Sequence, residues 1–218
     1  MRLDVLVDTW RAIVPFRGHQ DAKSRFSDFP FSGAMLAWAM LEDLLTALRN
    51  AASIREITVV TSISAGEITE SFPDIACIQE PPAIGLNPAI ALAATQSAQS
   101  GTTGTMVFLG DLPCIRPADV DHIGGMGISQ PSFIPDAAGT GTTLWCAPHP
   151  FPVQTHFGRH SRAAHRAAGC TELGTGNSAA PWPRLRRDVD TRVDLWDAHR
   201  IGVGATTHAI IAPYFPHE

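Results

Sequence analysis

The feature that most constrains the fold is an alternation of short β-branched apolar runs with longer stretches of helical periodicity. Residues 11–16 and 57–61 are typical of strands that are buried on both faces of a sheet. Between them, residues 33–49 repeat leucine and methionine at three- and four-residue spacing, which predicts one apolar helix face. Strands separated by helices in this way favour an α/β fold with a mainly parallel sheet.

The same alternation continues along the chain. Further strands are expected over residues 75–79, 106–109, 132–135, 144–147 and 186–188. Further helices are expected from Asn87 to about 100, from Ser161 through 166, and from Thr191 to about 200. Residues 1–218 are predicted to form a single domain, with a core over about 10–202 and a tail, 203–218, packed on the surface.

Composition excludes several classes of protein. With 44% hydrophobic and 17% charged residues, the chain is neither disordered nor a coiled coil. A net charge of -5 argues against a nucleic-acid partner, since phosphate backbones require a positive surface. Neither a membrane-spanning run nor a secretory signal is recognisable, and the four cysteines form no CxxC pair. We therefore expect a cytoplasmic protein with reduced cysteines and no membrane partner.

The loop after the first strand is a candidate phosphate site. It contains Gly18, which offers a backbone N–H group, and the cations Arg17, Lys23 and Arg25. Ligands of open α/β sheets collect at the carboxyl ends of the strands, where this loop lies. The alternative interpretation is a solvated surface turn.

Three carboxylates form a candidate metal site. Asp111 follows the expected strand 106–109, and Asp188 and Asp190 are two residues apart, so they share one face of an extended segment. Mg²⁺ takes oxygen ligands and often uses one or two carboxylates together with substrate phosphates. The alternatives are a plain turn at Asp111 and helix capping by the other two residues.

Two further segments could bind a small anion. Residues 139–143 form a glycine- and threonine-rich turn, although a plain hairpin turn would look the same. Residues 157–162 lead into a helix whose N-terminus could bind an anion. The histidines at 156, 160 and 165 match no zinc spacing, so a surface or substrate contact is favoured over a metal site.

Taken in order, these segments resemble the CofC/FbiD guanylyltransferases of coenzyme F420 biosynthesis, which belong to the nucleotidyltransferase superfamily. The resemblance covers residues 10–202 and rests on segments 13–16 with 22–25, 85–90, 110–113, 139–142, 157–161 with 165, and 188–191 with 194–195. It implies a Rossmann-like nucleotidyltransferase fold with a mainly parallel mixed sheet flanked by helices. It also implies an enzyme that joins GMP from GTP to a phosphorylated three-carbon acid and releases pyrophosphate.

The resemblance assigns residues to three groups. The nucleotide side comprises Arg17, Lys23, Arg25, Gly85 and Asn87. The acid side comprises Thr142, Gly158 and Ser161. Asp111, Asp188 and Asp190 would bind Mg²⁺, and Lys23 and Asp111 are the expected catalytic residues. The implied partners are GTP, the acid and the downstream F420 enzyme that takes the product; a homodimer is a further expectation.

The chain departs from the family pattern at two positions. Arg17 stands where a lysine is usual, and Thr143 stands where an asparagine is common beside the acid pocket. The family divides among 2-phospho-L-lactate, phosphoenolpyruvate and 3-phospho-D-glycerate, and the atypical pocket favours 3-phospho-D-glycerate.

Two other functions compete with this one. A nucleotidyltransferase could act on another acceptor, such as molybdopterin or a sugar phosphate, but the molybdenum enzyme opens with a loop richer in glycine than the segment around Gly18. A non-catalytic nucleotide-binding regulatory module would keep the phosphate loop without the carboxylates of the metal set.

Overall fold

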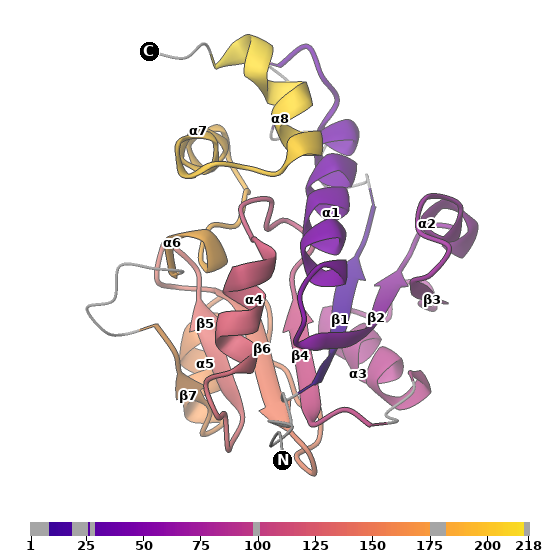
Figure 1. The fold of residues 1–218 in the computed structure, drawn as a ribbon, viewed down its shortest axis with the longest axis vertical. Helices are drawn as coiled ribbons and strands as arrows, with labels where there is room; N and C mark the ends of the chain where they lie inside the picture. Colours follow the sequence, from indigo (N-terminus) through magenta and orange to yellow (C-terminus); the bar gives the residue numbers. More distant parts are fainter. Residues whose placement is uncertain (1–8, 19–25, 27–28, 98–100, 175–181, 216–218) are drawn as a thin grey trace, which may run out of the picture.

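A seven-stranded mixed sheet forms the centre of the protein (Figure 1). The computed structural model describes residues 9–18, 26, 29–97, 101–174 and 182–215, and the strand count refers to these residues. The strands are β1 (Trp10–Phe16), β2 (Ile54–Thr61), β3 (Ala76–Gln79), β4 (Gly104–Phe108), β5 (Ser132–Pro135), β6 (Thr142–Pro148) and β7 (Thr171–Glu172). Their order is β3-β2-β1-β4-β6-β5-β7, and only β6 among them runs against the others.

Helices cover both faces of this sheet. Within the described residues they are α1 (Gly33–Arg49), α2 (Ala65–Ser71), α3 (Leu86–Gln96), α4 (Pro117–Gly124), α5 (Ser161–Ala167), α6 (Trp182–Leu185), α7 (Arg192–Ile201) and α8 (Ala205–Ile211), followed by a 3-10 turn (Ala212–Tyr214). The mixed sheet between two helical layers confirms the α/β fold expected from the sequence. No helix in the described ranges is both long and apolar enough to cross a membrane.

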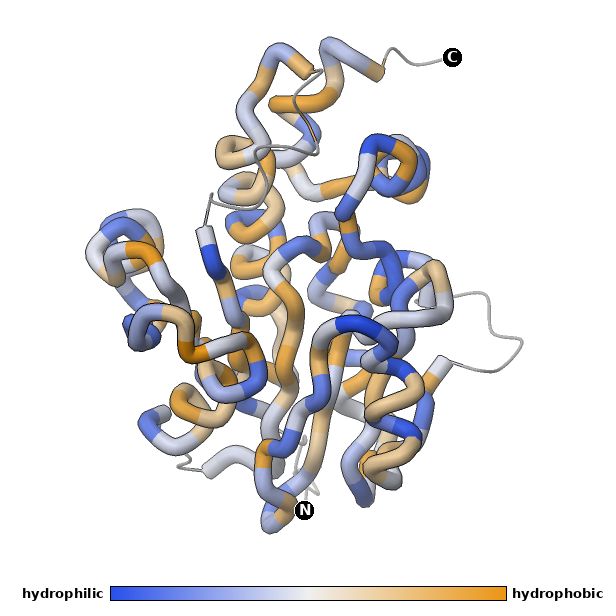
Figure 2. Tube along the Cα trace, turned by 180° about the vertical axis from the view of Figure 1, so that it is seen from behind, coloured by the Kyte–Doolittle hydropathy of each residue, from blue (hydrophilic) through white to orange (hydrophobic). Residues whose placement is uncertain are grey.

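Alternate residues of the central strands are buried against different helices. In β1, Ala12 and Val14 pack with α1, α2, α4 and α6, whereas Ile13 packs with α3 on the opposite face. On that second face α5 also contacts the sheet, because the ring of His165 stacks on Phe133 of β5. Hydrophobic residues consequently concentrate along the central strands (Figure 2).

The segment after residue 203 differs from the surface tail expected from the sequence. It forms α8, which packs against α1 and buries Thr207 and Ile211 completely. The buried carboxylate of Asp43 on α1 accepts hydrogen bonds from the backbone N–H groups of Thr206 (2.9 Å) and Thr207 (2.8 Å). These are unpaired donors of the first helical turn, so Asp43 caps α8 from a distant part of the chain.

Two other boundaries differ from the sequence prediction. The strand expected over residues 186–188 is wrong, because this segment is irregular and the side chain of Arg186 bonds to the carbonyl groups of Pro135 and Asp136. Helix α3 begins at Leu86 after Gly85, rather than with Asn87 as its N-cap. The capping box predicted for Thr191 and Asp194 is confirmed.

We expect Asp43→Ala to lower the free energy of unfolding by about 1–3 kcal/mol, because two buried N–H groups of α8 lose a charged acceptor. Urea unfolding measures this loss. Asp74→Ala is the matched control, because its ion pair with Arg49 is exposed and should contribute less than about 1 kcal/mol. Equal losses in the two variants would contradict the capping role of Asp43.

Candidate active site

A cavity of about 310 Å³ lies at the carboxyl ends of β1 and β4. Its lining includes Arg17 after β1, Asp111 after β4, and Asp190 before α7. Leu86, at the start of α3, lies in the same lining. Residues from four distant segments of the sequence therefore meet at the edge of the sheet where ligands of α/β proteins bind.

A backbone hydrogen bond holds two of these segments together. The N–H group of Val189 donates to the carbonyl oxygen of Asp111 at 3.1 Å. The side chains of Asp188 and Asp190 flank Val189, which is itself buried. Asp111 therefore lies beside the Asp188–Asp190 segment, and the joint action of these residues stays a prediction.

Negative charge accumulates around Asp188. Burial, together with the nearby charges of Asp136, Asp190 and Asp194, raises the pKa of its carboxyl to about 6. A divalent cation would relieve this repulsion, so the donor set fits Mg²⁺. In the described part of the chain, no group of three or more His, Cys, Asp or Glu side chains is placed to hold a metal ion. Mg²⁺ would therefore rely on one or two carboxylates together with ligand oxygens.

Arg17 is held by a residue that the sequence analysis missed. Its guanidinium lies 3.5 Å from Oε1 of Glu80, which follows β3 and is buried. The second carboxylate oxygen of Glu80 is buried and has no hydrogen-bond partner among the described residues. Only the position of Glu80 directly after a predicted strand signalled its proximity. The roles predicted for Lys23 and Arg25 concern residues outside the described part of the chain.

Asn87 connects the nucleotide segment to the acid segment. Its side-chain oxygen accepts hydrogen bonds from Thr155 Oγ1 (2.9 Å) and from the Phe157 N–H group (2.8 Å). Its amide nitrogen donates to the Phe157 carbonyl at 2.9 Å. Asn87 thus fixes the loop that leads to Gly158, a task that the sequence did not reveal. Its predicted place beside the guanosine, like that of Gly85, stays a prediction.

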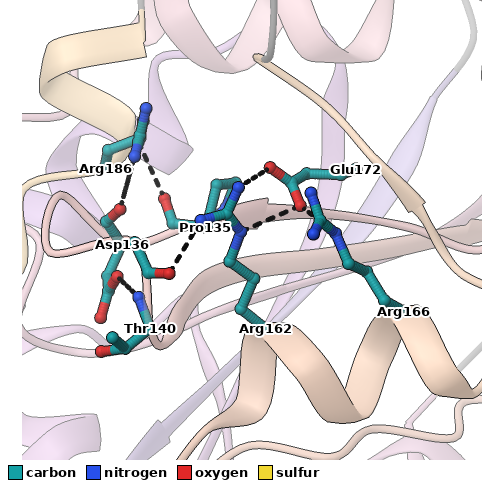
Figure 3. A network of polar contacts seen from close by, with 8 residues as sticks. Pro135, Asp136, Thr140, Arg162, Arg166, Glu172 and Arg186 are labelled. Atoms are coloured by element: carbon teal, nitrogen blue, oxygen red, sulfur yellow. Dashed lines mark hydrogen bonds and ion pairs between the residues drawn. The ribbon is translucent and has the colours of Figure 1, made fainter.

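The turn before β6 is held by a buried carboxylate. Asp136 accepts hydrogen bonds from the N–H groups of Thr140 and Gly141, each at 2.8 Å. A side chain at Gly141 would collide with that carboxylate, so the turn requires glycine there. Arg186 donates to the Asp136 carbonyl from the other side at 2.8 Å (Figure 3). Both contacts position Thr142, which follows this turn.

Two arginines of α5 form ion pairs with the same acidic residue. Arg162 and Arg166 pair with the two oxygens of Glu172, each at 2.7 Å (Figure 3). Arg162 also donates to the Gly139 carbonyl at 2.8 Å. These contacts attach α5 to the turn before β6 and to β7, so the arginines position the turn rather than presenting free charges.

The predicted acid residues Thr142 and Ser161 are both buried, and His165 lies beside them. The oxygen Oγ1 of Thr142 lies 3.0 Å from Nδ1 of His165. Ser161 is the first residue of α5, whereas His160 occupies the N-cap position. The N–H groups of Ser161 and Arg162 bond to the carbonyls of Gly158 and Thr140, so these two groups of the helix start are already paired.

Thr143 does not face this group of residues. It is fully buried, and its hydroxyl donates to the Leu185 carbonyl at 2.7 Å. Adjacent residues of a strand point to opposite faces, so Thr142 and Thr143 serve different surroundings. The departure from the family pattern at Thr143 therefore does not alter the predicted acid pocket directly.

The raised pKa of Asp188 predicts a pH-dependent stability. The folded protein holds this proton to a higher pH than the unfolded chain does. The free energy of unfolding should therefore decrease as the pH rises from 3.8 to about 6. In EDTA at about pH 8, Asp188→Asn should raise the free energy of unfolding by up to about 3 kcal/mol. Urea unfolding at that pH and at about pH 4 tests this, and equal effects at the two pH values would contradict the raised pKa of Asp188.

Comparison with known proteins identifies the family. No family model matches the chain. A phosphoenolpyruvate guanylyltransferase of Streptomyces avermitilis is 37% identical over 210 residues, covering 93% of this chain and 94% of the relative. A protein of the same name from Salinispora arenicola is 33% identical over 209 residues, covering 93% of each chain.

Solved structures agree on the fold. A protein from Desulfovibrio desulfuricans, provisionally described as a nucleotide-diphospho-sugar transferase, has a TM-score of 0.63 at 14% identity; the match covers 95% of this chain and 99% of that one. A nucleotidyl transferase from Methanothermobacter has a TM-score of 0.60 at 18% identity, with 89% and 98% covered. Together with the sequence relatives, they confirm the resemblance noted above: the chain belongs to the phosphoenolpyruvate guanylyltransferase (CofC/FbiD) family.

Proposed function

We propose that this protein transfers GMP from GTP to phosphoenolpyruvate and releases pyrophosphate, as a step towards coenzyme F420. The observation that carries the proposal is the identity of 37% and 33%, over nearly the full length, to two proteins named for this activity. The cavity that joins Arg17, Asp111 and Asp190 supports it, because cation and carboxylates are what a triphosphate and its metal require.

The reaction needs positioning and charge neutralisation more than covalent catalysis. An oxygen of the acceptor phosphate attacks the α-phosphorus of GTP, a new P–O bond forms, and the bond to the pyrophosphate breaks. Arg17 would neutralise part of the triphosphate charge, together with Lys23 and Arg25 from the same loop. A phosphate dianion is already a nucleophile, so no side chain has to act as a general base.

Asp111 and one of Asp188 and Asp190 would hold Mg²⁺ together with phosphate oxygens of GTP. When bound, this ion supplies Lewis-acid stabilisation of charge on the phosphate oxygens. Asp111 is fixed by its place at the end of a central strand, and the Val189–Asp111 hydrogen bond fixes the pair beside it. These contacts support the proposal that the carboxylates share one cation with the phosphate oxygens of GTP.

For the acid, phosphoenolpyruvate is favoured over the 3-phospho-D-glycerate expected from the sequence. That expectation depended on an atypical pocket, but the hydroxyl of Thr143 points to the Leu185 carbonyl in the interior. The relatives at 37% and 33% identity are named for phosphoenolpyruvate. Thr142, Gly158 and Ser161 would form the acid pocket.

Asp111→Asn should lower the rate of guanylyl transfer by about 100-fold or more, since a metal ligand loses its charge. Mass detection of the GDP-linked product, with GTP, Mg²⁺ and each of the three acids, measures this. Asp74→Asn is the control, because Asp74 is half-exposed and precedes β3 at the opposite edge of the sheet. Activity of Asp111→Asn within about threefold of wild type would refute the metal assignment. Equal use of ATP would refute guanine specificity, and turnover of none of the acids would refute the proposed reaction.

Ser161→Ala should raise the KM for the acid by an amount corresponding to about 1–3 kcal/mol, because a buried hydroxyl partner of the anion is lost. The KM for GTP should stay nearly unchanged. Steady-state kinetics with each substrate varied in turn measures both constants, and Ser71→Ala, at an exposed position at the end of α2, is the control. Equal weakening of both substrates would show that Ser161 supports the whole site rather than the acid pocket.

A further inference from the structure

His165 has both ring nitrogens in polar contacts although its side chain is fully buried. Its Nε2 lies 2.9 Å from the backbone nitrogen of His156, and its Nδ1 lies 3.0 Å from Oγ1 of Thr142. The ring is fixed between aromatic neighbours: it stacks on Phe133 and meets Phe157 edge-on, with ring centroids 5.4 Å apart in each pair. The imidazole therefore has little freedom to rotate away from these contacts.

The contact with His156 determines which nitrogen carries the proton. A backbone N–H group can only donate, so Nε2 of His165 must accept and cannot hold a hydrogen. A neutral imidazole carries one proton, which must then lie on Nδ1. The ring remains neutral at ordinary pH, since burial, with a smaller contribution from His156, lowers the pKa of His165 to about 4.

This tautomer decides the direction of the hydrogen bond to Thr142. Because Nδ1 carries the proton, it donates, and the Thr142 oxygen accepts. The proton of the Thr142 hydroxyl must then find an acceptor elsewhere, yet no other hydrogen bond of this side chain is found within the described residues. A buried hydroxyl donor without an acceptor is costly, and a bound anion would remove that cost.

We propose that His165 is a positioning residue for the phosphorylated acid: its Nδ1–H group holds the Thr142 oxygen and leaves the Thr142 hydroxyl proton to donate to the acid. The proposal rests on the proposed function for the identity of the acid, but its statement about the tautomer does not. It assigns His165 a task in substrate binding that does not involve proton transfer or metal binding.

The kinetic test uses phosphoenolpyruvate and GTP. His165→Leu should raise the KM for phosphoenolpyruvate about 10-fold and change the KM for GTP less than about twofold. The reason is that the Thr142 hydroxyl loses the hydrogen bond that orients its proton toward the acid, while the nucleotide contacts stay intact. His165→Asn should recover part of this loss, since its amide can donate from a place close to that of Nδ1. His122→Leu, the same change at an exposed histidine of α4, is the matched control and should leave both constants unchanged.

A double-mutant cycle separates positioning from general support. Thr142→Val alone should raise the KM for phosphoenolpyruvate, and adding His165→Leu to it should cause little further loss, because both changes remove one donor. Thr142→Ser keeps the hydroxyl and should keep most of the affinity. Additive losses in the cycle, or equal changes in the two KM values, would overturn the proposal.

The tautomer can be measured without any substrate. Nitrogen-15 NMR of the folded wild-type protein, with His165 identified by its absence in His165→Asn, should show a protonated Nδ1 and an unprotonated Nε2. A protonated Nε2 would overturn the proposal even if the enzyme proves active. A different result would refute the proposed substrate instead. In that case the protein would not turn over phosphoenolpyruvate, but it would show the expected tautomer, and the Thr142 and His165 substitutions would be non-additive in the KM for another phosphorylated acid.

Discussion

A backbone hydrogen bond, from Val189 to the Asp111 carbonyl, connects the two segments that carry the candidate metal carboxylates. Asp111 is fixed by the central strand β4, but Asp188 and Asp190 lie in an irregular segment that has no strand partner of its own. Asp188 lies near the charges of Asp136, Asp190 and Asp194, which together with burial raise the pKa of its carboxyl. The fold thus places these like charges near one another, and the proposed Mg²⁺ would offset part of their repulsion.

The predicted nucleotide and acid segments share structural supports. Asn87 lies at the start of α3, yet its side chain fixes the loop before Gly158. Arg186 lies next to the carboxylate segment, yet it holds the turn that precedes Thr142. These hydrogen bonds fix the predicted nucleotide segment relative to the predicted acid segment. An in-line attack requires such a fixed distance and orientation between the two substrates. Substitutions at these supports would be expected to affect both substrates, unlike substitutions at Ser161.

Sequence periodicity was sufficient for the main elements, because α1 and the central strands are buried on defined faces and show that burial in their residue pattern. It failed where a side chain decides the backbone conformation. Arg186 bonds to carbonyl groups across the sheet, and the expected strand there does not form. It failed again at α8, whose start depends on a carboxylate, Asp43, far away in the chain. The order of the site segments could be recognised in the sequence. The pairing of Arg17 with Glu80 and the burial of His165 could not, because they depend on how distant segments pack together.

The position of α8 has a consequence for how the protein can be altered. Met40 of α1 lines the cavity and also packs in the apolar cluster that contains Ile211 of α8. Helix α8 thus packs behind Met40, on the side of α1 that faces away from the cavity. Fusion partners or truncations at this end of the chain would disturb the packing of Met40 and so the shape of the cavity, although no residue of α8 lines the cavity itself. Evolutionary change in α8 could in the same way adjust the width of the site without touching any residue that contacts substrate.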